Sequence, residues 1–346
     1  MQRAILYITR KYPPAVGGME LLAHDVYTQV SRFREVSLLA NRRGNRYLIP
    51  FLARAAVYVV FRGHRFSHIH IGDGLLAPLL MLARLFSRAK LSITIHGLDI
   101  TYGNSLYQVL IPRSVARADR VVCISRAARD ECVARGVPED RCVVIPCGVH
   151  AESVRRSPLS MEDLARGRDL PWAEKTVLFS VGRLVRRKGY AWFVREVMPK
   201  LGPEYLYIIA GTGPERHAIE AAVAETDQTE RVFLLGPISE DEKLGFYRWA
   251  HLFLMPNIRV AGDMEGFGIT LIEAAVHGLP SVASDIEGIR DAVLDGETGY
   301  LIEEGDADAL VECIRSCRLQ REQTSERALK AFSWDRVVVK YLEVFD

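Results

Sequence analysis

Short apolar segments alternate with helical patterns along most of the chain. Apolar runs of strand length, bounded by glycines and polar turns, are typical of strands buried on both faces of a parallel sheet. In the first half such runs lie at residues 4–9, 36–39, 68–71, 91–96, 120–124 and 142–145. The second half continues with 176–181, 205–210, 232–235, 252–255, 279–284 and 300–302. The alternation predicts an α/β fold with doubly wound, mostly parallel sheets.

The length of the chain, 346 residues, predicts two domains that are each large enough for a core of their own. The first alternating block covers residues 1–150, and a polar, turn-prone segment at 151–175 is expected to be a linker. The second block covers 176–332, and the tail at 333–346 has the apolar periodicity of an amphipathic helix.

Composition indicates a globular protein, with 49% hydrophobic and 25% charged residues and a net charge of +2. Arg3 interrupts the start of the chain and Pro78 interrupts its longest apolar run, so we expect neither a signal peptide nor a transmembrane helix. The six cysteines form no Cys-x-x-Cys pair and predict reduced thiols in a cytoplasmic protein. Cys313 and Cys317, four residues apart, are expected to be packing residues of a helix.

Ligands of doubly wound folds bind beyond the carboxyl ends of the strands, so the loops that follow strands matter most. In the first half, Gly17 and Gly18 precede a predicted helix, and His96 follows a predicted strand. Each could face a ligand or serve only the local backbone. His68 and His70 share one face of a strand, but without a third ligand they predict plain strand positions and no metal.

The loops of the second half are richer in cations and glycines. Arg183 and Lys188 follow a predicted strand and could bind phosphate, whereas Arg186 and Arg187 are expected to be solvated. Gly211-x-Gly213 lacks the third glycine of the dinucleotide fingerprint, because Arg216 occupies that position, so a nicotinamide enzyme is a distant alternative.

The stretch 264–278 carries two carboxylates, Glu265 and Glu273, eight positions apart around a glycine-bearing loop that turns into a predicted helix. The backbone N–H groups expected at the start of this helix are those of Phe267, Gly268, Ile269 and Thr270. Such a helix terminus attracts phosphate, and the flanking carboxylates suit a ligand with hydroxyls on both sides of it, such as a nucleotide sugar. The other interpretation is an ordinary junction with two solvated glutamates.

Residues 31–65 hold eight arginines and one carboxylate, Glu35, interleaved with apolar residues. This segment predicts either contact with an anionic membrane surface or a lipid-linked substrate, or a solvated basic face of an ordinary surface helix. No nucleic-acid recognition motif accompanies the charge, and nucleic acid is not expected as a partner.

Taken together, these motifs resemble those of the family-4 retaining glycosyltransferases of the GT-B fold. The matching segments, in the family's order, are Gly17-Gly18-x-Glu20, His96-Gly97, Val144-Ile145-Pro146-x-Gly148-Val149, Gly182-Arg183-Leu184 with Lys188-Gly189, Gly211-x-Gly213, and Glu265-Gly-Phe-Gly with Glu273. The resemblance implies two Rossmann-like domains facing across a cleft, with the C-terminal helix crossing back to the first. At the hinge Cys147 and His150 replace the family's frequent Asn and Asp, which puts polar contacts of the hinge in doubt.

The resemblance also implies roles for the residues. The second domain would bind a nucleotide diphosphate sugar, with Arg183, Lys188, Gly17 and Gly18 around the diphosphate and Gly211 also among the donor-binding residues. Backbone near Ile238 would meet the base, Glu273 the ribose, Glu265 the transferred sugar and His96 the sugar near the acceptor.

A front-face, retaining transfer to an acceptor in glycan, glycolipid or cell-surface polysaccharide assembly is implied. No metal or cofactor is expected, and the chain is expected in the cytoplasm or peripherally on the inner face of the membrane. A soluble small-molecule acceptor is the main alternative. A catalytically inactive binding or scaffold subunit is a third hypothesis, which the presence of all four charged site residues disfavours.

Overall fold

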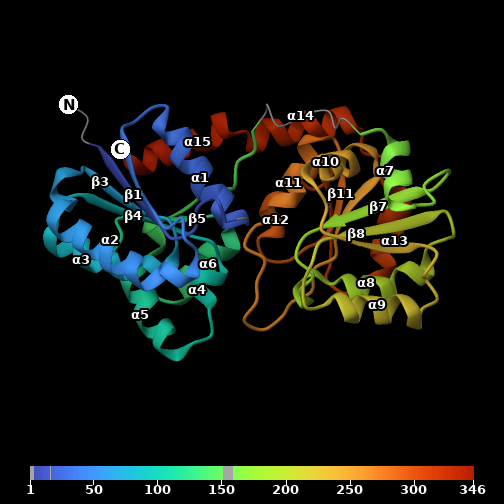
Figure 1. Cartoon of the computed structure of the whole chain (residues 1–346), viewed down its shortest axis with the longest axis horizontal. Coiled ribbons are helices and arrows are strands. Elements are labelled where there is room, and N and C mark those ends of the chain that lie inside the picture. Colours follow the sequence, from blue (N-terminus) through green and yellow to red (C-terminus); the bar gives the residue numbers. More distant parts are fainter. Residues whose placement is uncertain (1–3, 16, 151–158) are drawn as a thin grey trace. The chain divides into compact units, whose positions relative to one another are not determined.

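The computed structural model describes residues 4–15, 17–150 and 159–346. Within these ranges the chain forms two compact units, each built on a six-stranded parallel sheet (Figure 1). The first unit comprises 1–148, 262–267 and 334–346, and the second comprises 149–261 and 268–333. The first eight residues of the predicted linker, 151–158, lie outside the described residues.

The first sheet has the strand order β2-β1-β3-β4-β5-β6. Its strands are β1 (Ile5–Thr9), β2 (Val36–Ala40), β3 (His68–Ile71), β4 (Lys90–Ile95), β5 (Arg120–Cys123) and β6 (Cys142–Val144). Its helices are α1 (Gly18–Ser31), α2 (Leu48–Arg62), α3 (Pro78–Phe86), α4 (Leu98–Thr101), α5 (Ser105–Val115), α6 (Arg126–Ala134) and α15 (Trp334–Phe345). The order reverses between β1 and β3, which makes the carboxyl ends of these two strands the switch point of the sheet.

The two faces of the first sheet are packed differently. On one face, α2, α3, α5 and α6 contribute to a continuous apolar core with the strands. On the other face the sheet presents His68 and His70, whose rings lie 5.0 and 5.2 Å from that of Phe345 in α15. The two histidines share the hydroxyl of Ser92, each at 2.7 Å, so they are hydrogen-bonded strand residues, as the sequence predicts.

The second sheet has the order β12-β11-β10-β7-β8-β9. Its strands are β7 (Thr176–Val181), β8 (Tyr205–Ala210), β9 (Val232–Gly236), β10 (Leu252–Met255), β11 (Ser281–Ser284) and β12 (Gly299–Ile302). Its helices are α7 (Met161–Arg168), α8 (Tyr190–Glu196), α9 (Arg216–Glu225), α10 (Glu240–Trp249), α11 (Ile269–Val276), α12 (Ile289–Ala292), α13 (Ala307–Ser316) and α14 (Arg321–Phe332). Here the order reverses between β7 and β10, so the switch point lies after these strands.

Both faces of the second sheet are apolar. Helices α8, α9 and α13 pack on one of them, and Cys313 and Cys317 are partly buried against this core, which confirms them as packing residues. On the other face Phe179 of β7 stacks on Phe246 of α10, with ring centroids 4.8 Å apart. The structure thus confirms the predicted doubly wound α/β architecture, and α15 packs on the first unit through α1.

Three local expectations need correction. The predicted linker contains the helix α7, whose start is fixed by a capping box between Ser160 and Asp163. Strand β11 begins at Ser281, two residues later than predicted, because Pro280 has no N–H to donate to a neighbouring strand. Arg187, expected to be solvated, is buried, with 8% of its surface exposed.

Candidate functional site

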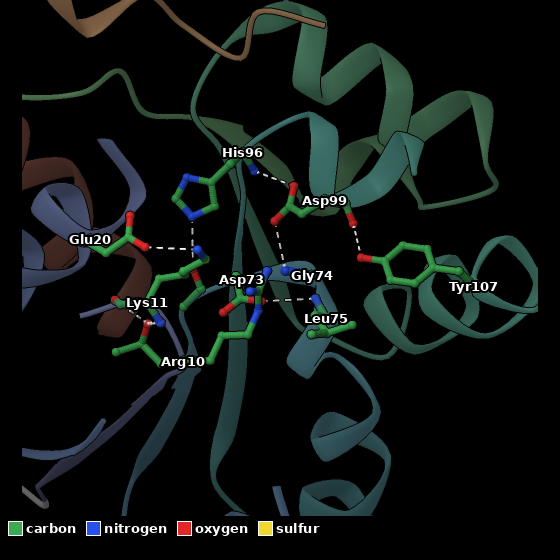
Figure 2. A network of polar contacts seen from close by, with 11 residues as sticks. Arg10, Lys11, Glu20, Asp73, Gly74, Leu75, His96, Asp99 and Tyr107 are labelled. Carbon is green, nitrogen blue, oxygen red and sulfur yellow. Dashed lines mark hydrogen bonds and ion pairs between the residues drawn. The ribbon is translucent and has the colours of Figure 1, made fainter. Parts of the chain in front are cut away.

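The switch point of the first sheet is spanned by a buried ion pair. Nε of Arg10, which follows β1, donates to Oδ1 of Asp73, which follows β3, at 2.8 Å (Figure 2). Oδ1 also accepts the N–H of Leu75 at 3.1 Å, while Oδ2 has no hydrogen-bond partner among the described residues. Burial raises the pKa of the Asp73 carboxyl, and the charge of Arg10 opposes that rise. The pair therefore joins the two strand-end loops that flank the switch point.

His96 is held over the same edge of the sheet. Its Nε2 lies 3.0 Å from the carbonyl oxygen of Gly72 in the loop after β3. A carbonyl only accepts, so Nε2 carries the proton, and in the neutral ring Nδ1 keeps its lone pair. The ring is buried and its orientation is fixed by backbone, which suits a contact to a ligand hydroxyl.

Asp99, to which the sequence assigned no role, organises these loops. Its Oδ1 accepts the backbone N–H of His96 and its Oδ2 accepts that of Gly74, both at 2.8 Å. The Tyr107 hydroxyl donates to the Asp99 carbonyl at 2.6 Å. Asp99 is three residues past His96 at the start of a helix, a spacing that could have indicated a backbone-capping carboxylate. One side chain thus ties the His96 loop to the loop after β3.

The glycine pair lies at the start of α1, as predicted. A Cβ on Gly17 would come within 2.5 Å of Oε2 of Glu20, a buried residue whose Oε1 pairs with Nζ of Lys11 at 2.9 Å. The carboxylate of the Lys11–Glu20 pair, drawn in Figure 2, therefore lies beside Gly17, in the space that a side chain at this position would need. Gly17 and Gly18 are both exposed, so their backbone is accessible to a ligand.

In the second unit the loops after β7 and β8 are interlocked through backbone. A Cβ on Gly211 would lie 1.8 Å from the carbonyl oxygen of Gly182, and one on Gly213 would lie 2.2 Å from that of Leu184. The N–H of Leu184 donates to Thr212 at 2.9 Å, and that of Glu215 donates to Leu184 at 3.0 Å. Gly211-x-Gly213 is therefore required for loop packing, which the dinucleotide-motif comparison did not predict.

The cations of the loop after β7 differ in exposure. Arg183 is exposed, whereas Lys188 is buried, with 7% of its surface exposed. Gly189, which follows Lys188, adopts φ of 67°, and a Cβ there would meet the carbonyl oxygen of Pro256, after β10, at 1.9 Å. The N–H of Ile258 also donates to the Arg187 carbonyl at 2.9 Å. Backbone contacts thus fix Lys188 at the switch point of the second sheet.

The helix predicted at the Glu265–Glu273 stretch exists. Gly268, with φ of 89°, caps α11, which begins at Ile269. Its N-terminus follows β10 and so lies at the edge of the sheet that also carries the loops with Lys188, Gly211 and Ile238. Phe267 is buried, and Ile269 and Thr270 are partly buried. The structure places the helix N-terminus where the sequence predicts it.

Glu265 precedes this helix and is buried, with 9% of its surface exposed. It belongs to the segment 262–267, which groups with the first unit. Within that unit a Cβ on Gly266 would lie 2.2 Å from the His96 carbonyl oxygen, and one on Gly97 would lie 3.0 Å from Sδ of Met264. The structure therefore brings Glu265 and His96 into neighbouring segments.

Glu273, on α11, has two partners from α10 that sequence reasoning missed. Its Oε2 accepts from the Tyr247 hydroxyl at 3.0 Å and lies 3.4 Å from Nζ of Lys243. Burial lowers the pKa of Lys243, but Glu273 and Glu240 more than offset this and raise it overall. Lys243 and Tyr247 are four residues apart, so the sequence predicts that they lie on one face of a helix, but not which residue they contact. They orient the carboxylate through its Oε2.

Family models match both halves of the chain. The model for Glycosyltransferase Family 4 matches residues 7–153, and the model for glycosyl transferases group 1 matches residues 166–331. The mannosyltransferase described as GDP-mannose-dependent alpha-(1-6)-phosphatidylinositol monomannoside mannosyltransferase, from Mycolicibacterium smegmatis, is 26% identical over 90% of this chain and 88% of its own. The amylovoran biosynthesis glycosyltransferase AmsK of Erwinia amylovora is 29% identical over 71% of this chain and 59% of its own.

Solved structures share the fold at low sequence identity. HepE of Anabaena, solved in complex with UDP, superposes with a TM-score of 0.77 at 18% identity and covers 98% of each chain. Sucrose-phosphate synthase of Thermosynechococcus elongatus reaches 0.77 at 20% identity, with 99% of this chain and 98% of the other covered. The fold is thus GT-B, and the chain is a glycosyltransferase. It belongs to family 4 of these enzymes.

Proposed function

We propose that this enzyme transfers a sugar from a nucleotide diphosphate sugar to an acceptor in glycan, glycolipid or cell-surface polysaccharide assembly. One observation supports the donor class most strongly. At a single edge of the second sheet, a loop with Arg183 and Lys188 and the N-terminus of α11 combine cations with backbone N–H groups. This combination suits the diphosphate of such a donor.

The proposed roles follow from this placement. Arg183 and Lys188 neutralise the diphosphate as it leaves, and the backbone of Gly17 and Gly18 approaches it closely; Gly211 keeps the donor-binding loops packed. Glu273, oriented by Tyr247 and Lys243, accepts hydrogen bonds from the ribose. The loop at Ile238 meets the base.

The sugar side of the donor is assigned to residues of the first unit. Glu265 accepts from hydroxyls of the transferred sugar, and His96 contacts that sugar near the acceptor. In the bond-making step, the bond from the anomeric carbon to phosphate breaks and a bond to the acceptor oxygen forms on the same face. The acceptor proton passes to an oxygen of the departing phosphate. The protein's cations replace a metal ion in this scheme, and among the described residues no group of three or more potential ligand side chains is gathered for a metal.

A two-part assay tests donor and acceptor. The enzyme is incubated with UDP-, GDP- and ADP-linked radioactive sugars and a membrane lipid extract, and release of nucleoside diphosphate is measured. We expect one donor to be consumed and the label to partition into the organic phase. Label confined to the aqueous phase would favour the soluble-acceptor alternative. No consumption of any nucleotide sugar would contradict the proposal.

A peripheral membrane position, which we propose on the cytoplasmic face, is supported by helix α2. Its side chains Ile49, Val57 and Phe61 are 79%, 58% and 69% exposed, and arginines flank them in the sequence. None of the helices in the described part of the chain is long and apolar enough to cross a bilayer. Exposed apolar residues among arginines suit the interface of an anionic bilayer.

Co-sedimentation with anionic vesicles at low salt tests this position. We expect the wild type to sediment and a Val57→Ser, Phe61→Ser variant to remain largely in solution. Val339→Ser, an exposed apolar residue of α15, is the matched control. A wild type that ignores the vesicles would refute the membrane position and leave the transfer reaction standing.

A further inference from the structure

A basic cavity of about 640 Å³ lies on the first unit, away from the residues discussed so far. Its charged lining consists of Arg84, Arg113, Arg117, Arg135, Arg141 and Asp119. Five guanidinium groups thus face one carboxylate. The arginines come from α3, from α5 and its end, from the end of α6, and from the turn before β6, so four parts of the chain converge on one hollow.

This cavity lies at the opposite edge of the sheet from His96. Asp119 directly precedes β5, and Arg141 directly precedes β6, so the cavity is at the amino ends of these strands. His96 follows the carboxyl end of the neighbouring parallel strand β4. Strands of this length separate the two edges by roughly 13–20 Å at about 3.3 Å per residue. The cavity is therefore not part of the proposed transfer site.

Most of the positive charge in the cavity is not neutralised within it. Arg84 pairs with Asp119 at 2.7 Å, and Arg135 pairs with Glu131 of its own helix. Among residues 4–15, 17–150 and 159–346, neither Arg113 nor Arg117 forms an ion pair. A multiply charged anion would supply the missing negative charge.

Two of the arginines are already oriented. Nη1 of Arg141 donates to the carbonyl oxygens of Ala116 and Ala118, at 2.8 and 3.2 Å, which are neutral acceptors. Nε of Arg135 donates to Oε1 of Gln108 at 2.9 Å. Both side chains are half-buried. Fixing a guanidinium in advance reduces the entropy lost when it binds phosphate, so these two favour a built site over a random cluster.

The helices that supply the arginines also expose apolar side chains. On α3, Leu85 and Phe86 follow Arg84 and are 77% and 49% exposed. On α5, Leu106 and Leu110 precede Arg113 and are 74% and 43% exposed. Helices α3 and α5 pack against each other. Leu85 and Phe86 end α3 beside Arg84, and Leu110 is one turn from Arg113 on α5, whereas Leu106 lies two turns from Arg113 at the other end of α5. A soluble anion would gain nothing from exposed leucines, whereas a lipid would.

We propose that this cavity binds the phosphate headgroup of an anionic lipid, with the apolar residues of α3 and α5 entering the acyl region. The proposal rests on the membrane position proposed above and specifies a headgroup site for it. Arginine forks contact the phosphate oxygens, and Leu85, Phe86 and Leu110 contact the chains. The enzyme is thereby anchored by a site separate from its donor and acceptor sites.

The test uses vesicles of phosphatidylcholine with and without phosphatidylglycerol. The variant Arg113→Gln, Arg117→Gln removes two cavity charges, and Arg166→Gln, Arg336→Gln removes two exposed arginines elsewhere. At about 1 kcal/mol per arginine near an anionic surface, the cavity variant should bind phosphatidylglycerol vesicles roughly 30-fold more weakly. The control variant should bind within about threefold of the wild type.

A soluble arm separates the possible failures. Binding of inorganic pyrophosphate to the wild type and to the same two variants is measured by thermal shift. If the cavity variant and the control bind vesicles equally, the headgroup site is overturned while the membrane position stands. If the wild type ignores vesicles, both are overturned. If the wild type binds pyrophosphate but not vesicles, and the cavity variant does not bind pyrophosphate, the cavity would be assigned to a soluble phosphate compound instead of a lipid.

Discussion

The loops at the switch points of the two sheets are joined by different kinds of contact. In the first, Arg10 and Asp73 join the loops after β1 and β3 through a buried ion pair, and His96 is fixed by the Gly72 carbonyl. In the second, the loops after β7, β8 and β10 are joined by glycines that touch carbonyl oxygens, and the cation Arg183 stays exposed. Arg10 is thus engaged by the buried Asp73, whereas Arg183 is exposed to solvent. We therefore propose that the first unit orients the donor and that the second unit neutralises its diphosphate.

The largest effect is expected from Gly211→Ala. The added Cβ would lie 1.8 Å from the Gly182 carbonyl oxygen and the residue has φ of 134°, so the loops must separate. We expect a loss of more than about 4 kcal/mol in the stability of the second unit, seen by hydrogen exchange, and loss of transfer. Gly296→Ala is the control, because φ there is 73° but no atom lies within 4 Å. It should cost only about 1 kcal/mol, and equal costs would show that the interlocked loops do not matter.

Next is Lys188→Ala. Removing one stabilising contact to the leaving diphosphate should lower kcat on the order of 10²–10³-fold. Arg186→Ala changes an exposed arginine of the same loop and should leave the rate nearly unchanged. Steady-state kinetics and circular dichroism of the three proteins separate catalysis from folding. A Lys188→Ala variant with wild-type kcat would contradict the proposal that the second unit neutralises the diphosphate.

For the first unit the matching change is Arg10→Met. It leaves the Asp73 carboxylate buried without its cation, so the unit should lose about 3 kcal/mol of stability. The double variant Arg10→Met, Asp73→Asn should recover much of this, since no buried charge is left. Urea unfolding followed by region-resolved hydrogen exchange measures both. A double variant no more stable than Arg10→Met would contradict a structural role for the ion pair.

Lowering the pH should have a somewhat smaller effect, on the stability of the first unit. Burial lowers the pKa of His68 to about 4, whereas the unfolded chain titrates near 6.5. Between these values the unfolded state takes up the proton first, so stability falls as pH falls. From pH 6.5 to 5 the loss is about 2 kcal/mol. Burial also lowers the pKa of His70, which acts in the same direction, so His68→Asn should reduce this dependence in hydrogen exchange of the first unit without abolishing it. A wild type with a flat profile would contradict the assignment.

The smallest effect is expected from Tyr247→Phe. It removes one of the two partners that orient Glu273, at a cost of about 1 kcal/mol. We expect the donor KM to rise about fivefold with kcat retained, because binding to the ribose is lost equally in the ground and transition states. Tyr300→Phe, on β12 and away from Glu273, is the control. A fall in kcat at unchanged KM would place Glu273 at the reacting centre instead.

The sequence predicted those features that depend on local pattern. Apolar periodicity located β3, β7 and β10, and the glycine before Ile269 located the start of α11. It did not predict contacts between residues distant in the chain. Asp73 and Arg10 are 63 residues apart, and only the strand order brings them together. The burial of Arg187 was also missed, because a run of basic residues does not reveal which of them the backbone turns inward.

The central claim, that the second unit neutralises the diphosphate through Arg183 and Lys188, is tested most directly by calorimetric titration. UDP, GDP and ADP are titrated into the wild type, Lys188→Ala and Arg186→Ala. We predict that one nucleoside diphosphate binds the wild type and Arg186→Ala with similar affinity, and Lys188→Ala at least tenfold more weakly. Equal affinity for all three proteins would contradict the claim.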